Sequence, residues 1–354
     1  MIRLTLIPVL LATMPARSQP SDDQPQPQPQ PQPTTETTAE SEATPADDAL
    51  RRRNRDQADR PVPFQRPSEG QQDPRANIEF PIVIVQPNAS SVFRSMSDLD
   101  STSNGFSVAA FEAGVDTLIV ASPALTFRIG VSTEVSYYDW DGSEPLLADT
   151  PDSDDPFDSA QRHEIGTTAI IRSSQTTTWI AGASINSSYE SGADFNDSIG
   201  GQFLGGGTYA FNDDLTLGFG LNIIFDLDGE PDVIPLPFVE WRFAEGWELA
   251  SNSRGVNITY ERSDTLKYGV GARFLGREFR LDDDGPIPGG IANDNSVAVA
   301  AFVEWDVSNE LKLEFGAGAQ VYSEFELINR RDVRVFESDS DPAFVGVFRA
   351  TLSF

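Results

Sequence analysis

Apolar and polar side chains alternate along most of the chain beyond residue 125. In the segment LTLGFGLNIIFDL, residues 215–227, nearly every second position is Leu, Phe or Ile. This period of two is typical of a β-strand with one apolar and one polar face. The same pattern predicts twelve strands, at 125–137, 162–173, 176–189, 199–211, 215–227, 234–243, 247–252, 255–262, 265–281, 297–307, 311–327 and 342–354.

The connections between these strands alternate in length. Short turns at one end and long loops at the other are the design of bacterial outer-membrane barrels, whereas a soluble β-sandwich gives no reason for strict alternation. We therefore predict an all-β fold, an antiparallel up-and-down transmembrane β-barrel of 12 strands. The short turns fall at 173–175, 212–214, 244–246, 263–264 and 308–310, the longer loops at 139–161, 190–198, 228–233, 282–296 and 328–341, and one connection on the long side, 253–254, is as short as a turn.

Residues 78–122 fit the pattern less well. The segment IEFPIVIVQ is apolar on both faces and carries Pro81, and FSVAAFEAGVDTLIVASP breaks its alternation near Glu112 and Asp116. These residues could add an N-terminal hairpin, which gives 14 strands, or fold as a plug or a periplasmic cap. We favour the additional hairpin.

Aromatic side chains on the apolar register gather near the strand ends. Two aromatic bands around a middle of Leu, Ile, Val and Ala are typical of the girdles of a membrane barrel; a soluble β-core with scattered aromatics is the alternative. The band near the short turns contains Trp179, Phe211, Trp241, Phe243, Trp247, Trp305 and Phe354, and the band near the long loops contains Tyr137, Tyr189, Phe225, Phe279 and Phe325.

The last predicted strand runs to the final residue. Phe348, Ala350, Leu352 and Phe354 share its apolar face, and they resemble the terminal aromatic signature by which the barrel-assembly machinery recognises outer-membrane barrels. A sheet inside a membrane must close, because lipid cannot satisfy the polar groups of a free edge. We expect this strand to close the barrel.

Three longer motifs resemble an outer-membrane β-barrel domain family of unknown function. They are FDLDGEPDVIPLPFVEWRFAEGWEL, REFRLDDDG and SDPAFVGVFRATLSF, and the resemblance extends over about residues 100–354. It implies a barrel fold and a bacterial outer-membrane location. It implies no activity and no catalytic residue.

The N-terminal part of the chain predicts export and a tether. Residues 1–18 read as a signal peptide, with Arg3, an apolar run and small residues before the cleavage position. Residues 19–76 form a Pro/Gln-rich and then Arg-rich linker, which is too polar to fold. Its Arg51–Arg66 part suits either contact with an anionic surface such as cell-wall polymer or plain solvation. The barrel then occupies 77–354.

Composition excludes several functions. The 55 acidic residues outnumber the 25 Lys and Arg, and the net charge of −30 excludes nucleic acid as a sequence-independent partner. The chain has no cysteine, so disulfides, thiolate metal sites and cysteine nucleophiles are excluded. No phosphate loop or nucleotide fingerprint is present, and we predict no cofactor.

His163 is the single histidine of the chain. A membrane-embedded hydrolase could use it with Ser159 or Glu164, but no nucleophile motif surrounds these residues. We interpret His163 as a solvated residue at the barrel rim and predict that the chain is not an enzyme.

An acidic loop offers weak candidates for calcium ligands, because hard cations prefer several carboxylate oxygens held together. The candidates are Asp152, Asp154 and Asp155. They lack the full spacing of a calcium loop, and charged loops are ordinary on a barrel exterior.

The polar register of the strands predicts a lumen lined by both signs of charge. Mixed charge can line an aqueous pore or close a narrow barrel. We therefore predict a passive channel or porin for small solutes. A structural or surface-interaction barrel with a blocked lumen and acidic extracellular loops is the alternative, and a hydrolase the remote one. The lumen-lining candidates are Arg128, Glu134, Arg172, Glu240, Arg242, Lys267, Arg273, Glu314 and Arg349.

Overall fold

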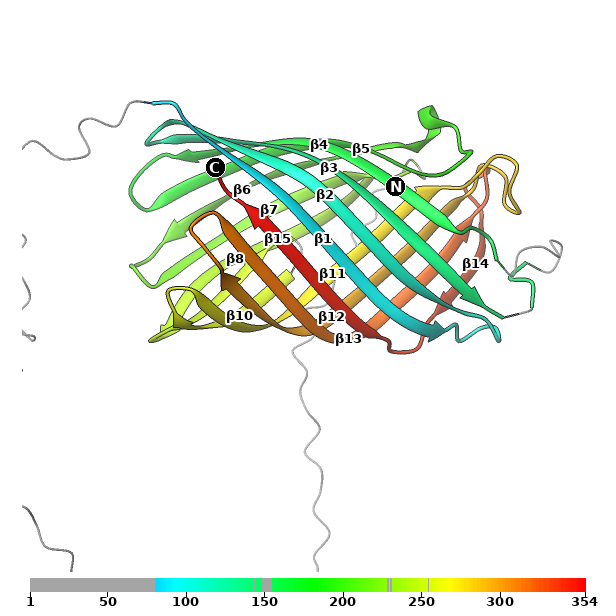
Figure 1. Cartoon of the computed structure of the whole chain (residues 1–354). Coiled ribbons are helices and arrows are strands. Elements are labelled where there is room, and N and C mark those ends of the chain that lie inside the picture. The colour runs from blue at the N-terminus through cyan, green and yellow to red at the C-terminus, as the bar shows by residue number, and fades with distance from the viewer. Residues whose placement is uncertain (1–79, 143, 148–154, 228, 230, 254) are drawn as a thin grey trace, which may run out of the picture. The chain divides into compact units, whose positions relative to one another are not determined.

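The computed structural model describes residues 80–354 except 143, 148–154, 228, 230 and 254. This part of the chain is one antiparallel sheet that curls into a closed barrel with steeply tilted strands (Figure 1). The strands are β1 (Ile82–Asp98), β2 (Gly105–Ser122), β3 (Leu125–Asp141), β4 (Ser159–Arg172), β5 (Thr177–Glu190), β6 (Ile199–Ala210), β7 (Leu215–Phe225), β8 (Pro231–Ala244), β9 (Trp247–Asn252), β10 (Gly255–Ser263), β11 (Leu266–Arg280), β12 (Ile291–Asp306), β13 (Leu311–Ile328), β14 (Arg334–Asp339) and β15 (Phe344–Leu352), and a 3₁₀ turn, η2 (Phe195–Ser198), precedes β6.

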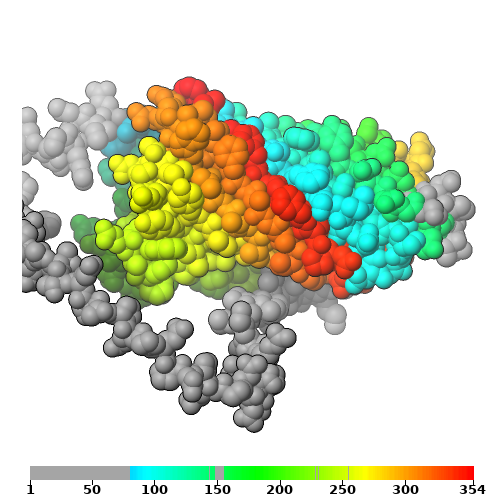
Figure 2. Space-filling model, turned by 60° about the horizontal axis from the view of Figure 1, so that its bottom comes forward, coloured from blue at the N-terminus to red at the C-terminus, as the bar shows by residue number. Residues whose placement is uncertain are grey.

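The C-terminal strand closes the barrel, as its sequence predicts. β15 pairs with β1 on one side and with β13 on the other, so that Arg349 lies between Ser90 and Glu314. Figures 1 and 2 both show β15, in red, between the cyan β1 and the orange β13. Of the 15 strands, β14 alone lies outside the ring: it pairs with the second half of β13, and 14 strands form the closed wall.

The strand count corrects the prediction of twelve. Residues 78–122 supply β1 and β2, the additional hairpin. Glu112 and Asp116 do not break the register of β2; they point into the lumen, whereas Phe111 and Val115 are exposed outside. The first part of β2 is apolar on its inner face as well, because Phe106 and Val108 are buried inside the barrel.

The two ends of the barrel differ, as the predicted loop lengths require. Short turns join β2 to β3, β4 to β5, β6 to β7, β8 to β9, β10 to β11 and β12 to β13. The start of β1 and the end of the chain also lie at this short-turn end, where Phe354 and Val85 exchange backbone hydrogen bonds. The longer loops lie at the other end. The described part of the chain has no helix long and apolar enough to cross a membrane.

The outer face of the wall is apolar. Over most of the barrel, every second strand residue is an exposed aliphatic or aromatic side chain. This is the pattern of a lipid-facing surface. All seven predicted aromatics of the short-turn girdle are exposed there, and Tyr137 and Phe225 are exposed near the long loops.

The prediction that Phe279 and Phe325 belong to the long-loop girdle is wrong. Both side chains point into the barrel and are only 1% and 0% exposed. In β13 the cause is a bulge. Val297 of β12 lies opposite Tyr322 and the next residue, Ala298, lies opposite Gln320, so Val321 is an extra residue. One extra residue moves all following side chains to the other face. In β11, the outer residues occupy even positions such as Tyr268 and Phe274, which places Phe279 inside.

The predicted signal peptide (1–18), the linker (19–76) and its Arg51–Arg66 part lie outside the described residues. So do Asp152 and Asp154 among the calcium candidates. The predicted barrel (77–354) contains all described strands.

Candidate functional site: the lumen

All nine lumen-lining candidates lie on the strand faces opposite the exposed apolar register. Arg128 and Glu134 alternate on β3 with the exposed Phe127, Ile129 and Val131. The same relation holds for Arg172, Glu240, Arg242, Lys267, Arg273, Glu314 and Arg349 on their strands. The wall therefore carries its charged side chains inward.

The half of the lumen next to the short turns is open. Arg242 there is exposed and forms loose ion pairs with Glu240 at 3.3 Å and Glu248 at 3.6 Å. A hollow of about 430 Å³ is lined by Arg172, Thr178, Thr208 and Glu240 among others. Charged groups of both signs in contact with solvent are compatible with an aqueous vestibule.

The half next to the long loops is crossed by a charge layer, which we define as Arg94, Glu134, Arg277, Asp294 and Gln320. The guanidinium of Arg94 donates to the carboxylate of Asp294 at 2.7 Å and to the side-chain oxygen of Gln320 at 3.1 Å. Arg94 and Asp294 are both buried. Arg94, Asp294 and Gln320 belong to β1, β12 and β13, so their contacts connect the strands of one arc of the wall.

A second ion pair of the charge layer spans the lumen itself. Arg277 of β11 donates to Glu134 of β3 at 2.9 Å, and it lies 3.8 Å from Asp294. β3 and β11 are not neighbours: β2, β1, β15, β13 and β12 separate them on one side, and β4 and β5 separate them on the other, because β11 pairs with β5 near the long loops. The ion pair therefore joins two strands that do not pair with each other and narrows the passage at this level.

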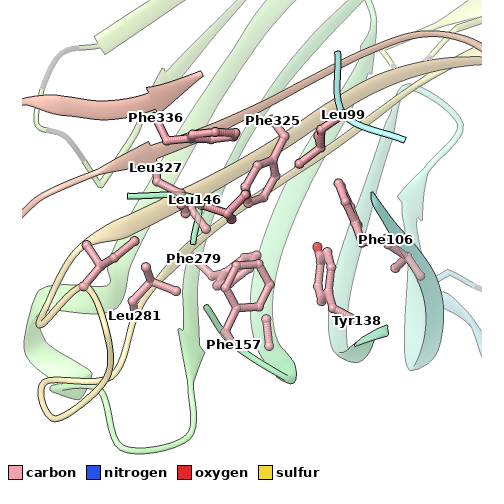
Figure 3. Close-up of a cluster of buried hydrophobic side chains, with 14 residues drawn as sticks. Leu99, Phe106, Tyr138, Leu146, Phe157, Phe279, Leu281, Phe325, Leu327 and Phe336 are labelled. Carbon is pink, nitrogen blue, oxygen red and sulfur yellow. The ribbon is translucent and has the colours of Figure 1, made fainter. Parts of the chain in front are cut away.

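An apolar layer lies beside the charge layer, towards the long loops. Phe157, from the loop between β3 and β4, packs at 4.8 Å against both Tyr138 and Phe279, measured between ring centroids. Figure 3 shows Phe157, Phe279 and Phe325, from separate segments, pointing towards one another. The full set is Leu99, Phe106, Val108, Tyr138, Leu146, Phe157, Ala160, Phe279, Leu281, Ile287, Ala292, Phe325, Leu327 and Phe336.

The two layers are in direct contact. The guanidinium of Arg94 lies over the ring of Phe106 at 4.5 Å, a cation–π contact. Tyr138 belongs to the apolar layer through its ring and donates its hydroxyl to Asp294 at 3.3 Å. Among the described residues, the lumen is thus open at its short-turn end and occluded near the long loops.

Sequence reasoning missed most of this occlusion. Arg94 lies within residues 78–122, whose sequence fits a hairpin, a plug or a cap, and Asp294 falls in the predicted loop 282–296, although β12 begins at Ile291. The alternation of ANDNSVAVA was the available signal, because Asp294 and Ser296 continue the inner register of Ala298. The sequence gives no sign that Phe157 lies in the lumen, because a loop has no periodic pattern of side-chain directions.

His163 lies on the exposed outer face, two residues before Ile165. Its two ring nitrogens lie 2.9 Å from the Thr133 hydroxyl and 3.3 Å from the Tyr189 hydroxyl. It lines a groove of about 610 Å³ on the outside of β2–β6, together with apolar residues such as Ile185. In the described part of the chain, neither Ser159 nor Glu164, its predicted partners, forms a hydrogen bond with it.

The residues of the predicted assembly signal lie on the outer face of β15 and just beyond it. Phe348, Leu352 and Phe354 are exposed, and Ala350 is opposite Ala89 of β1 and Leu313 of β13. The third calcium candidate, Asp155, is described, but its two predicted neighbours are not.

Comparison with solved structures finds bacterial outer-membrane barrels. An outer-membrane channel from Pseudomonas putida F1 is 9% identical over 80% of this chain and 100% of its own, with a TM-score of 0.46. The toluene transporter TodX of Pseudomonas putida is 9% identical over 76% and 89%, with a TM-score of 0.34. The translocator domain of the autotransporter NalP from Neisseria meningitidis is 13% identical over 87% and 97%, with a TM-score of 0.30.

The chain folds as a closed antiparallel β-barrel with an apolar outer face. This is the fold that the sequence resemblance implied. At these identities and TM-scores, neither the activity nor the substrate of the compared proteins is transferred to this chain. No protein-family model matches the sequence. No curated protein matches it either.

Proposed function

We propose that the protein is an outer-membrane channel for small solutes that rests closed at its long-loop end. The observation that carries the proposal is the asymmetry of the lumen: an open, charged vestibule on one side and the stacked charge and apolar layers on the other. In the membrane, the short-turn end with both ends of the barrel domain faces the periplasm, and the signal peptide brings the chain there.

The closed layers are built in a way that permits opening. Two guanidinium nitrogens of Arg94, Nε and Nη2, have no hydrogen-bond partner among the described residues although they are buried. A buried polar group without a partner costs about 1–3 kcal/mol. The apolar layer includes Leu146 and Phe157 from a loop, and not only from the rigid wall. A layer with unsatisfied donors and a loop-borne part is easier to displace than a wall strand.

Planar-bilayer conductance of the detergent-purified protein tests the proposal. We expect rare current steps from the wild type and a raised open probability from the double variant Phe157→Ala, Phe325→Ala. Removing a buried Phe costs about 3–5 kcal/mol of packing, and each 1.4 kcal/mol taken from the closed state shifts the closed–open ratio about tenfold. Phe211→Ala, on the outer face at the other end, is the matched control and should not change the open probability.

The second candidate is a structural or surface-interaction barrel with a blocked lumen, which the occlusion also favours. Heat-modifiable protein that gives no current either as wild type or as the Phe157, Phe325 double variant would establish this candidate and exclude the channel.

Our proposal assigns no catalysis to His163. Its exchange for Ala should leave conductance as it is. The C-terminal strand is proposed to serve assembly, and the outer face to contact outer-membrane lipid.

A further inference from the structure

Threonine side chains form a belt on the inner wall next to the short turns. Thr178 of β5 lies opposite Thr208 of β6, and Thr216 of β7 lies one step closer to the turns. All three occupy inward positions, because they alternate with exposed residues of the outer face. These outer residues are Trp179, Tyr209 and Leu217. We define Thr178, Thr208 and Thr216 as the threonine belt.

A charged residue stands at each end of the threonine belt. Arg172 of β4 lies opposite Thr178, and Glu240 of β8 lies opposite Thr216. The belt and both charged residues line the hollow of about 430 Å³ in the open half of the lumen. Five consecutive strands, β4 to β8, therefore contribute one polar surface to the same hollow.

The hydroxyl groups of the belt are available to a ligand. With the described residues, the hydroxyls of Thr178, Thr208 and Thr216 form no hydrogen bond, and the three side chains are only partly buried. Gly218 lies opposite Thr208, and a Cβ at this glycine would meet the Thr208 methyl group at 2.7 Å. The wall beside Thr208 is therefore low. Each threonine offers one donor and two acceptor lone pairs, which is what the hydroxyl groups of a solute require.

The two charges of the hollow are not equivalent. Glu240 pairs with Arg242 at 3.3 Å. Arg172 is exposed, and its guanidinium forms no ion pair with another described residue. The uncompensated charge of the hollow is therefore positive. A guanidinium binds a carboxylate through two parallel hydrogen bonds, whereas the Glu240 carboxylate has lone pairs left for the hydroxyl of a ligand.

The spacing of the strands sets the size of the ligand. Neighbouring strands lie about 4.8 Å apart, so that Thr178 and Thr216, on β5 and β7, are separated by about 10 Å. Arg172 and Glu240 lie one strand further out on either side, and their long side chains reach back towards the belt. An extended molecule of six carbon atoms can therefore contact both the cation and the belt.

We infer that this hollow binds small polyhydroxylated carboxylates of the size of a six-carbon sugar acid. The inference rests on the proposed channel function and assigns its substrate class. Arg172 holds the carboxylate, the threonine belt exchanges hydrogen bonds with the hydroxyls of the solute, and Glu240 accepts from the hydroxyl at the far end. An apolar solute finds little matching surface, because Ala210 is the one apolar residue in the lining. A cationic solute meets the unpaired Arg172.

Binding can be measured without opening the lumen, because the hollow belongs to its open half. Saturation-transfer NMR of the full chain in detergent gives the dissociation constants of three probes with six carbon atoms each. Gluconate has both the carboxylate and the hydroxyls, glucose lacks the carboxylate, and hexanoate lacks the hydroxyls. We expect gluconate to bind at least about tenfold more tightly than either of the others, because only gluconate uses both parts of the hollow.

Two variants test the named residues. Arg172→Gln should raise the dissociation constant of gluconate about tenfold, because a charge-assisted pair is lost. Thr208→Val keeps the shape of the side chain without its hydroxyl and should raise it about threefold. The matched control is Thr259→Val, on the inner face of β10 and outside the hollow, which should leave the affinity unchanged. Heat-modifiable migration shows that each variant is folded.

The outcome separates this inference from the channel itself. Gluconate that binds no better than glucose or hexanoate overturns the inference, and so does gluconate binding that is unchanged in both Arg172→Gln and Thr208→Val. Current steps in planar bilayers would then still support the channel. Selective gluconate binding without current in the wild type and in the Phe157, Phe325 double variant would instead overturn the channel, and with it the role of the bound solute as a transported substrate.

Discussion

Asp294 is the residue on which the charge layer depends most. Its carboxylate accepts from Arg94 and Tyr138, and Arg277 lies 3.8 Å away. Because Asp294 is fully buried, water cannot replace a hydrogen bond that this carboxylate loses. The stability of the layer is therefore concentrated in one carboxylate that two cations share.

We expect Asp294→Ala to lower the free energy of unfolding by about 3–5 kcal/mol, because the exchange leaves buried Arg94 without its counter-charge. Glu240→Ala removes an exposed pair with Arg242 and should cost less than about 1 kcal/mol. Urea unfolding in detergent, followed by tryptophan fluorescence, measures both. An equal decrease in the free energy of unfolding in the two variants would contradict the view that Asp294 stabilises the charge layer.

At the same scale, the sequence predicts which side chains point inward far better than which of them meet. Alternation alone places Arg273 and Glu314 on the inner face, and the structure joins them at 2.9 Å. Arg277 and Glu134 are 143 positions apart, and their contact depends on the diameter and shear of a closed ring. Neither quantity can be read from a strand pattern when the strand count is uncertain.

Among the elements, β13 shows how a regular sequence can conceal an irregular strand. Apolar residues occupy the odd positions from Leu311 to Leu327 except Ser323, so the pattern predicts a single face throughout. The bulge at Val321 reverses the faces and delivers Phe325 to the apolar layer. A bulge depends on the pairing with β12, which the sequence of β13 does not contain. β2 is the reverse case: it appears irregular because its inner face is apolar at Phe106 and Val108, which are buried in the apolar layer, and acidic at Glu112 and Asp116.

The bulge predicts that two consecutive residues of β13 face lipid. In the cysteine-free chain, a fluorophore on Val321→Cys and one on Tyr322→Cys should both be quenched by spin-labelled lipid, because both side chains are about half exposed outside. The matched pair Val299→Cys and Ala300→Cys, in the regular part of β12, should give quenching at 299 only. Quenching at just one of 321 and 322 would show unbroken alternation and exclude the bulge.

For the whole molecule, the alternation of loop lengths predicts the topology correctly, and the structure adds a difference between the two ends of the lumen. The short-turn end is open, with Arg242 exposed inside it, and the long-loop end is sealed by side chains from wall and loop together. The seal was not predictable from periodicity, because Leu146 and Phe157 belong to a loop. In the proposed membrane location, such a lumen is accessible from one side only.

That asymmetry gives a prediction for intact cells. A maleimide–polyethylene glycol too large to cross the outer membrane should label Arg331→Cys, in the exposed β13–β14 loop at the long-loop end. Arg242→Cys should react only after the outer membrane is permeabilised, because the proposed orientation opens its vestibule to the periplasm and the two layers close the other way in. Labelling of Arg242→Cys on intact cells would mean either the opposite orientation or a lumen open from end to end. The two are distinguished by Arg331→Cys, which loses its label only if the orientation is reversed.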